Sequence, residues 1–382
     1  MKVLILGSVA LPVPPPMQGG TERIAYWQAI GLAKRGHTIT LVAAKGSTPN
    51  PAYTLVEIGG GDTVAGSSRQ ISNLKPQISN EGMYTEGSRN LRKEAIYLSE
   101  VEQYILDHGK EYDVILNNMR AGETLFVPAA KAVGVPYVTV MHLPIFYELA
   151  AYFAATNTAV ITISNAQRMG FDNVRYAGTV YNCVEPELLA IDPRGLPQAQ
   201  HDPRGQGPDA RDYVLMMGSV APHKNQKDGI LAAKALGKTI ILAGKIGNQA
   251  YWDAEIAPLV DGKTVIHKGE MGLEEKISLL AGAEALVFPI IWPEPFGLVM
   301  IEAMAVGTPV VAYRNGAVPE VVVDGKTGFI IDEAQGVGGL SVALNRINEI
   351  DRAACRKHVE ENFTVEKMIE SLATALENVA HP

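Results

Sequence analysis

The sequence has little cysteine and lacks any long hydrophobic run. Cys183 and Cys355 are the only cysteines among 382 residues, and they lie far apart, without the spacing of metal ligands. This usage favours a reducing, cytoplasmic setting. No segment is apolar over the roughly 20 residues that a membrane-spanning helix needs, so we expect no stable membrane insertion. Residues 3–11 resemble the apolar part of a signal peptide. They lack a small-residue cleavage site and lead into a glycine loop, which predicts a first Rossmann strand instead.

An excess of positive charge is also missing. The formal net charge is -8 at pH 7, which argues against a general nucleic-acid binder. A solvated helix face explains the short basic cluster formed by Arg89, Arg92 and Lys93. Hydrophobic residues make up 47% and charged residues 19% of the chain, a balance typical of globular proteins. The length allows two domains, each with a core of its own.

Short apolar runs alternate with amphipathic segments along the first half of the chain. Residues 3–6 predict a buried strand, and Gly19 and Gly20 then permit a close approach of the backbone to a ligand. A helix follows, with Thr21 as its expected N-cap. The stretch over 59–88 is rich in Gly, Ser and Asn and predicts a long surface loop.

A break in this pattern divides the chain. Residues 191–211 carry several prolines and glycines without apolar periodicity, which predicts a linker. The alternation then restarts with a strand at 213–217. We therefore predict an α/β fold of two Rossmann-like domains facing across a cleft. The boundaries follow as 1–190 for the first domain, 212–362 for the second, and 363–382 for a last helix that crosses back to the first.

Residues 294–309 carry the strongest functional pattern. Glu294 and Glu302 lie eight positions apart, between a strand-like run at 285–291 and another that opens after Pro309. The order strand, loop, helix, strand places Glu294 at the carboxyl end of a strand, where open α/β sheets bind ligands. The helix start that follows suits a phosphate.

Glu302 belongs to an almost uncharged helix, where a carboxylate needs a partner. One glutamate is thus expected to hold hydroxyls at one end of a long polar ligand, and the other those at the far end. Two solvated surface carboxylates are the plain alternative.

Two further side chains have positions that fit a site. His142 follows the strand predicted over 137–141, and Lys224 lies near the start of the first helix of the second domain. A structural histidine and an exposed helix lysine are the alternatives. In a functional interpretation, Lys224 neutralises a phosphate.

These residues together resemble the retaining, GT-B-fold glycosyltransferases of glycosyltransferase family 4, and the resemblance covers essentially the whole chain. Its most specific part is the paired-glutamate signature with its flanks. The residues that carry the resemblance are Glu294-Pro295-Phe296-Gly297, Glu302-Ala303-Met304-Ala305, Gly307-Thr308-Pro309-Val310-Val311, Gly316, Glu320 and Gly325-Lys326-Thr327-Gly328, and more loosely Gly19-Gly20, Arg35-Gly36-His37, His142, Ser164 and Asn182.

The resemblance implies a donor site in the second domain and an acceptor site in the first. Glu294 would bind hydroxyls of the donor sugar, Glu302 the ribose hydroxyls, and Lys224 the diphosphate. From the first domain, His142 would contact the sugar. The remaining donor-binding positions implied are Gly19, Gly20, Gly218, Ser219, Phe296, Gly297 and Leu298.

Three departures from the family pattern stand out. Ser219 occupies the place of a phosphate-binding arginine, whose contact is then missing or comes from Lys245 or Arg23. Cys183 replaces the usual glycine after Asn182, and Ala317 replaces the second glycine of a common pair.

The expected activity is transfer of a hexose from a nucleoside diphosphate sugar, with retention of configuration and without a metal or other cofactor. The acceptor is expected to be a small molecule or a glycan. The absence of a strongly basic amphipathic helix favours a soluble one. A nucleotide-sugar epimerase and a catalytically weak nucleotide-sugar-binding protein are the alternatives. The sequence predicts no nucleic-acid partner and gives no oligomeric state.

Overall fold

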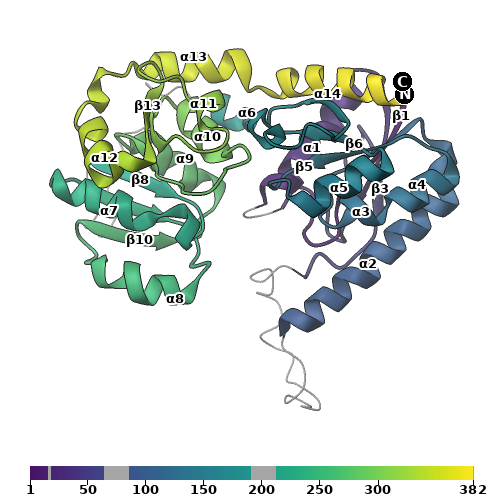
Figure 1. Cartoon of the computed structure of the whole chain (residues 1–382), viewed down its shortest axis with the longest axis horizontal. Helices are drawn as coiled ribbons and strands as arrows, with labels where there is room; N and C mark the ends of the chain where they lie inside the picture. Colours follow the sequence, from purple (N-terminus) through teal and green to yellow (C-terminus); the bar gives the residue numbers. More distant parts are fainter. Residues whose placement is uncertain (16–18, 64–85, 191–211, 382) are drawn as a thin grey trace. The chain divides into compact units, whose positions relative to one another are not determined.

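The computed structural model describes residues 1–15, 19–63, 86–190 and 212–381. The predicted linker over 191–211 lies outside the described residues, as does most of the predicted surface loop over 59–88. Contacts divide the chain into two units. Unit 1 comprises Met1–Ile163, Gly170–Val180 and Met368–Pro382, and unit 2 comprises Ser164–Met169 and Tyr181–Lys367. Figure 1 shows that helices flank a sheet in each unit.

Unit 1 contains a seven-stranded parallel sheet with the order β3-β2-β1-β4-β5-β6-β7. Its strands are β1 (Lys2–Ser8), β2 (Thr38–Ala43), β3 (Thr54–Glu57), β4 (Val114–Asn117), β5 (Tyr137–Met141), β6 (Ala159–Thr162) and β7 (Tyr176–Thr179). Residues 3–6 of the central strand β1 are fully buried, because helices cover both faces of such a sheet. The strands β2 and β3 lie on one side of β1, and β4 and the strands after it lie on the other. This change of side makes the carboxyl ends of β1 and β4 a topological switch point.

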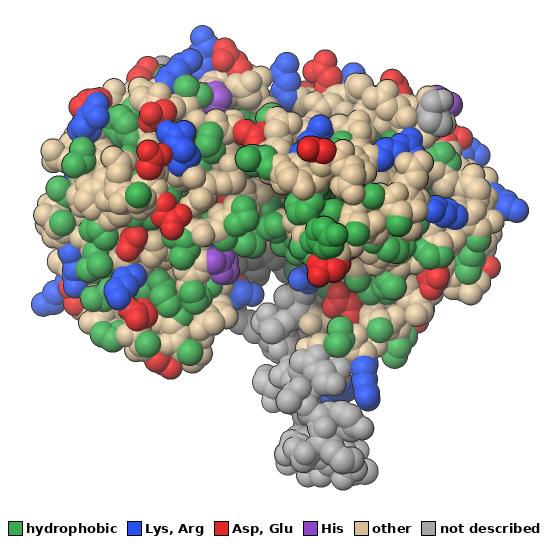
Figure 2. All heavy atoms as spheres, in the orientation of Figure 1, with side chains coloured by type: hydrophobic (Ala, Val, Ile, Leu, Met, Phe, Trp, Pro, Cys, Tyr) green, Lys and Arg blue, Asp and Glu red, His purple; other side chains and the backbone are tan. Residues whose placement is uncertain are grey.

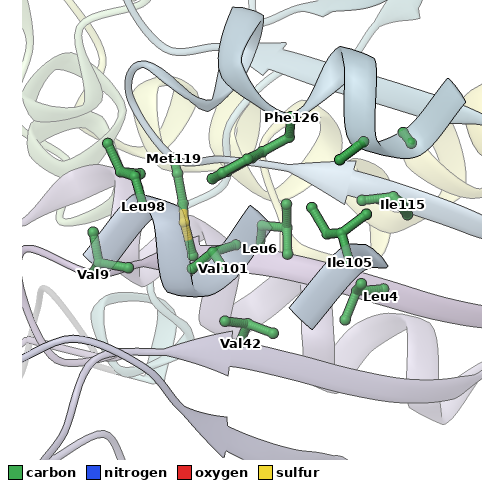
Figure 3. Close-up of a cluster of buried hydrophobic side chains, with 12 residues drawn as sticks. Leu4, Leu6, Val9, Val42, Leu98, Val101, Ile105, Ile115, Met119 and Phe126 are labelled. Atoms are coloured by element: carbon green, nitrogen blue, oxygen red, sulfur yellow. The ribbon is translucent and has the colours of Figure 1, made fainter. Parts of the chain in front are cut away.

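The helices of unit 1 bury apolar stripes against this sheet. They are α1 (Gly20–Lys34), α2 (Glu86–His108), α3 (Gly122–Leu125), α4 (Val127–Val133), α5 (Tyr147–Thr156) and most of α14 (Val365–Ala380). On α2, Leu98, Val101 and Ile105 recur at helical spacing and point into one cluster with Leu6 and Phe126 (Figure 3). This packing fixes the strands whose ends carry the polar residues described below.

Unit 2 repeats the plan with a six-stranded parallel sheet of order β10-β9-β8-β11-β12-β13. Its strands are β8 (Tyr213–Met217), β9 (Thr239–Ala243), β10 (Val265–Gly269), β11 (Leu286–Phe288), β12 (Val310–Tyr313) and β13 (Gly328–Ile331). Its helices are α6 (Pro186–Ala190), α7 (Gln226–Ala235), α8 (Gln249–Tyr251), α9 (Leu273–Gly282), α10 (Leu298–Ala305), α11 (Val318–Val321), α12 (Gly336–Asn345) and α13 (Arg352–Asn362). The switch point of this sheet lies between β8 and β11.

The predicted fold class of Rossmann-like α/β domains is confirmed, while some local predictions are wrong. Thr21 is not the N-cap of α1, since the helix begins at Gly20 and Gly19 caps it without a side-chain hydrogen bond. The first helix after β8 begins at Gln226, two residues after Lys224, because Lys224 ends a short 3₁₀ turn and Asn225 adopts a left-handed conformation. The short strands β3 and β7 were not predicted.

Charged side chains of both signs are interspersed over the visible face of the molecule, as Figure 2 shows. Within the described ranges, no helix is long and apolar enough to cross a membrane.

Candidate functional site

The loop between β11 and α10 places Glu294 beyond the carboxyl end of a central strand, as predicted. Gly297 caps α10 in a left-handed conformation with φ 80°, which glycine adopts without strain. The backbone therefore turns sharply from the loop into the helix. Leu298 opens that helix four residues after Glu294, and the first N–H groups of a helix lack acceptors within the helix itself.

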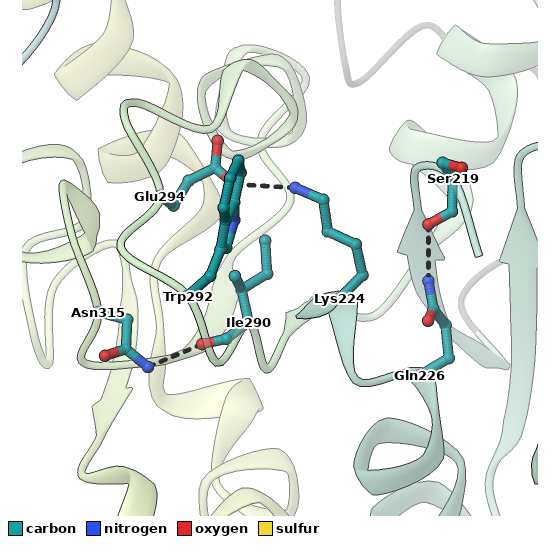
Figure 4. A network of polar contacts seen from close by, with 7 residues as sticks. All are labelled: Ser219, Lys224, Gln226, Ile290, Trp292, Glu294 and Asn315. Carbon is teal, nitrogen blue, oxygen red and sulfur yellow. Dashed lines mark hydrogen bonds and ion pairs between the residues drawn. The ribbon is translucent and has the colours of Figure 1, made fainter. Parts of the chain in front are cut away.

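Glu294 is held on one side by a cation and an indole. Lys224 Nζ lies 2.8 Å from Glu294 Oε2, and Trp292 Nε1 donates to the same oxygen at 2.9 Å. The lysine ammonium also lies 5.3 Å from the centroid of the Trp292 ring (Figure 4). Among the described residues, Glu294 Oε1 has no hydrogen-bond partner. One carboxylate oxygen is thus fixed by the protein and the other can accept from a ligand hydroxyl.

Lys224 reaches Glu294 from the neighbouring strand. It ends the 3₁₀ turn Pro222–Lys224 that follows β8, whereas Glu294 follows β11, so the pair lies at the switch point of the sheet. Only 11% of the Glu294 side chain is exposed, against 24% for Lys224. An ion pair with this little exposure is screened less by salt than a surface pair.

Gly316 packs directly against the backbone of the Glu294 loop. Its φ is 52°, and a Cβ at this position would lie 2.3 Å from the backbone oxygen of Glu294. The N–H of Ala317 donates to that same oxygen at 2.9 Å, and Asn315 Nδ2 donates to the Ile290 carbonyl at 2.8 Å (Figure 4). The β12–α11 loop therefore fixes the path of the Glu294 backbone and leaves no space for a side chain at Gly316.

Glu302 has the partner that its apolar helix requires. Lys276 of α9 lies with Nζ 2.5 Å from Glu302 Oε1, and 12% of the Glu302 side chain is exposed. Within the described part of the chain, Oε2 of Glu302 has no hydrogen-bond partner. Glu302 thus repeats the arrangement of Glu294, with one oxygen on a lysine and one left for a ligand. Sequence reasoning missed Lys276, although the need for a cation near Glu302 pointed to one.

The loops after β8 and β9 approach each other closely at Gly218 and Ser219. A Cβ at Gly244 would lie 2.1 Å from the Gly218 carbonyl oxygen, and one at Gly247 would lie 2.0 Å from Ser219 Oγ. Gln226 Nε2 donates to the Ser219 carbonyl at 3.0 Å (Figure 4). A long side chain at Ser219 would need a different path of these loops, which agrees with the loss of the family arginine. The roles predicted for Lys245 and Arg23 as its substitutes stay predictions.

Glu320, which belongs to the signature, makes hydrogen bonds to other parts of unit 2. Its carboxylate accepts from the N–H groups of Asn165 at 2.8 Å and Ala166 at 2.7 Å, and from the Tyr181 hydroxyl at 2.8 Å. Burial, followed by the Glu320 carboxylate, raises the pKa of Tyr181 to about 12. Tyr181 also lies 6.0 Å from Phe296 between ring centroids. Glu320 therefore ties two separate segments of unit 2 to the site loop.

Unit 1 contains a pocket of about 210 Å³ at its own switch point. The residues after β1 and β4 line it, together with Thr21 and Glu22 of α1, Glu94 of α2 and His142 after β5. Gly19 immediately precedes α1, and a Cβ at Gly19 would lie 2.5 Å from Pro15 Cγ. The predicted site residues thus fall in both units, with Gly19, Gly20 and His142 in unit 1 and all others in unit 2.

His142 is embedded in the polar interior of unit 1. Its Nε2 lies 2.8 Å from Asn118 Oδ1, and Asn118 Nδ2 donates to Gln28 Oε1 at 2.8 Å. Burial lowers the pKa of His142 to about 4, so the ring is neutral at neutral pH. Sequence reasoning missed Gln28 and Asn118, which belong to α1 and to the loop after β4.

Known proteins share parts of this sequence and this fold. Residues 198–362 match the family model described as glycosyl transferases group 1. A structure of Anabaena Alr3699/HepE in complex with UDP and glucose superposes with a TM-score of 0.70 at 19% identity, covering 99% of each chain. That identity shows the fold alone, which is the GT-B fold of two Rossmann-like domains.

Curated relatives agree with the family. Glycogen synthase of Mycobacterium tuberculosis is 33% identical over 44% of this chain and 40% of its own length. The MMP alpha-(1->4)-mannosyltransferase of Mycolicibacterium hassiacum is 25% identical over 74% of this chain and 72% of its own. The chain thus spans less than half the length of the glycogen synthase and about 72% of the mannosyltransferase.

The architecture is thus the GT-B fold, and the half of the chain that carries Glu294 and Glu302 is similar to known glycosyltransferases. The match to glycosyl transferases group 1 spans residues 198–362, which include the signature around Glu294 and Glu302. The assignment of the chain to the retaining enzymes stays a prediction.

Proposed function

We propose that this protein transfers a hexose from a nucleoside diphosphate sugar to a soluble small molecule or glycan, with retention of configuration. The observation that carries the proposal is the pair of half-occupied carboxylates. Glu294 and Glu302 each have one oxygen on a lysine and the other without a protein partner among the described residues. Two such acceptors on one loop and helix suit a ligand with hydroxyls at two separate places, such as a sugar and a ribose.

The chemistry needs positive potential beside the leaving group. The bond from the anomeric carbon to the diphosphate oxygen breaks, and negative charge develops on that oxygen. Lys224 and the start of α10 are fixed there before the reaction and therefore stabilise this charge without reorganisation. We infer that no metal is needed if these groups neutralise the diphosphate. The acceptor oxygen forms the new bond on the same face, and its proton goes to the departing diphosphate.

The names of similar proteins support a nucleotide-sugar donor. The Anabaena structure contains UDP and glucose, and the mycobacterial relatives are named as a glycogen synthase and a mannosyltransferase. Two buried cysteines, Cys183 and Cys355, are free thiols, and burial raises the pKa of both. Such thiols fit the proposed cytoplasmic setting.

Incubation with a panel of nucleotide sugars, with and without candidate acceptors, tests the activity. A retaining transferase releases nucleotide only with an acceptor, and the new linkage keeps the anomeric configuration of the donor by NMR. Conversion of the sugar without an acceptor would identify an epimerase. Binding without either reaction would identify a nucleotide-sugar-binding protein, and both outcomes would refute the proposal.

A lysine pair on neighbouring turns tests the role of Lys224. Replacement of Lys224 by Met should lower kcat by roughly 100- to 1,000-fold, since one preorganised donor to a developing charge contributes about this much. Lys227 is the matched control, because it lies three residues further on and pairs with Glu255 on the surface. Lys227→Met should keep normal turnover. Equal losses in both variants would contradict the proposed role.

A further inference from the structure

A chain of buried amides leads from α1 to the ring of His142. Gln28 is 1% exposed and Asn118 is 2% exposed, and no charged group takes part in their two hydrogen bonds. Such buried polar groups are costly unless each donor meets an acceptor. The order of donors and acceptors along this chain is therefore constrained from one end to the other.

The direction of the chain determines the proton on the ring. Asn118 Nδ2 donates to Gln28 Oε1, so Oδ1 is the Asn118 atom that faces His142. An amide oxygen only accepts, so His142 Nε2 must carry the hydrogen. The neutral ring then has its lone pair on Nδ1. Among the described residues, Nδ1 has no hydrogen-bond partner, and His142 lines the pocket of unit 1.

We propose that Gln28 and Asn118 are positioning residues that hold His142 in the Nε2–H tautomer, so that Nδ1 accepts a hydrogen bond from a hydroxyl of a substrate. This role rests on the proposed glycosyl transfer, because the hydroxyls of a sugar substrate supply the donor. It gives the pocket a preference for hydroxyl groups over groups that only accept. A hydrogen bond to the second ring nitrogen sets the tautomer in the same way at other histidine sites.

The charges around the ring leave this state intact. Glu22 of α1, Glu94 of α2 and Arg120 after β4 are the charged groups that line the same pocket. Burial is nevertheless the single cause of the lowered pKa of His142. The ring therefore stays neutral above about pH 5. In this range the hydrogen bonds from Gln28 through Asn118 select one of its two neutral tautomers.

Nitrogen NMR of histidine-labelled protein measures the tautomer directly and does not depend on activity. We expect a single Nε2–H tautomer for His142 between pH 6 and 8. Gln28→Glu should preserve it, because a carboxylate accepts from Asn118 as Gln28 Oε1 does. An Nδ1–H tautomer in the native protein would overturn the proposal, since it requires both amides to be reversed. A change of tautomer in Gln28→Glu would overturn it as well.

Asn118→Asp is the second arm of the experiment. A carboxylate beside the ring favours its charged form, so His142 should titrate at a higher pKa than in the native protein. Turnover of nucleotide sugar at neutral pH should fall by about 10- to 100-fold, as for other partners that orient a histidine. Asn157→Asp is the matched control, because Asn157 is exposed at the end of α5 in the same unit. It should change neither the titration nor the turnover.

The two possible failures are distinguishable. If the wild-type protein transfers no sugar but shows the Nε2–H tautomer, the proposed function fails, while the hydrogen-bonded arrangement of Gln28, Asn118 and His142 is confirmed. If the protein transfers sugar and Asn118→Asp keeps native turnover and the native pKa of His142, Gln28 and Asn118 have no positioning role.

Discussion

Replacement of Glu302 by Gln tests the nucleotide site most sharply, because it changes one charge and almost no volume. The carboxylate lies in α10 among buried apolar residues, with Oε1 on Lys276 at 2.5 Å and Oε2 available to a ligand. If Oε2 accepts from ribose hydroxyls, the variant loses the charge-assisted part of those hydrogen bonds. The loop that holds Glu294 and Lys224 is left unchanged.

The magnitude follows from that contact. A hydrogen bond to a charged group contributes about 1.5–3 kcal/mol, and each 1.4 kcal/mol corresponds to about tenfold in Kd. The affinity for a nucleoside diphosphate should therefore fall by roughly 10- to 100-fold. Lys276→Met keeps the charge of Glu302 but removes the group that orients it, so a smaller loss of about tenfold is expected. The loss of binding free energy in the double variant should be smaller than the sum of the two single losses, because the two side chains are in contact.

Titration calorimetry with a nucleoside diphosphate measures these affinities, and the melting temperature of each variant controls for folding. Glu274→Gln is the matched control, since Glu274 is an exposed glutamate on the same helix as Lys276. It should bind like the native protein. Native affinity in Glu302→Gln, or an equal loss in Glu274→Gln, would refute the assignment of Glu302 to the ribose.

Three further outcomes are expected from the geometry. Gly316→Ala should displace the Glu294 backbone and abolish donor binding, whereas Gly325→Ala, with φ 71° and open space around its Cβ, should only lower the unfolding free energy by about 1 kcal/mol. The pKa of His142 is lower in the folded state than its ordinary value of 6.5, so the unfolded chain binds more protons between these values and stability falls as pH drops from about 6.5 to about 4. Urea denaturation of the native protein and of His142→Gln should diverge by at most about 3 kcal/mol across this window, and parallel curves would contradict the burial of a neutral ring. Glu320→Gln should lower stability by about 2 kcal/mol in the same assay, because three donors lose a charged acceptor, and an unchanged midpoint would count against that contact.

The sequence was sufficient for the fold class because the central strands of both sheets are buried parallel strands with continuous apolar runs. Residues 3–6 and 213–216 are examples. The strand β3, over Thr54–Glu57, was missed since it has four residues of mixed exposure and no such run. Thr21 was assigned as a cap from its residue type, whereas the helix starts one residue earlier, at a glycine.

Site residues within one motif were predictable, and those joined only by the fold were not. Glu294 and Glu302 belong to a local pattern that places both on one loop and helix. Lys276 and Glu302 are 26 residues apart, and Gln28 and Asn118 are 90 apart. Sequence spacing carries no information on such contacts, because they depend on which strands become neighbours in the sheet.

A structure of the protein with a bound nucleotide sugar tests the central claim most directly. The account predicts ribose hydroxyls on Glu302 Oε2, the diphosphate beside Lys224 and the start of α10, and sugar hydroxyls on Glu294 Oε1. A nucleotide bound away from the β8–β11 switch point, with both carboxylates still engaged only by their lysines, would contradict it.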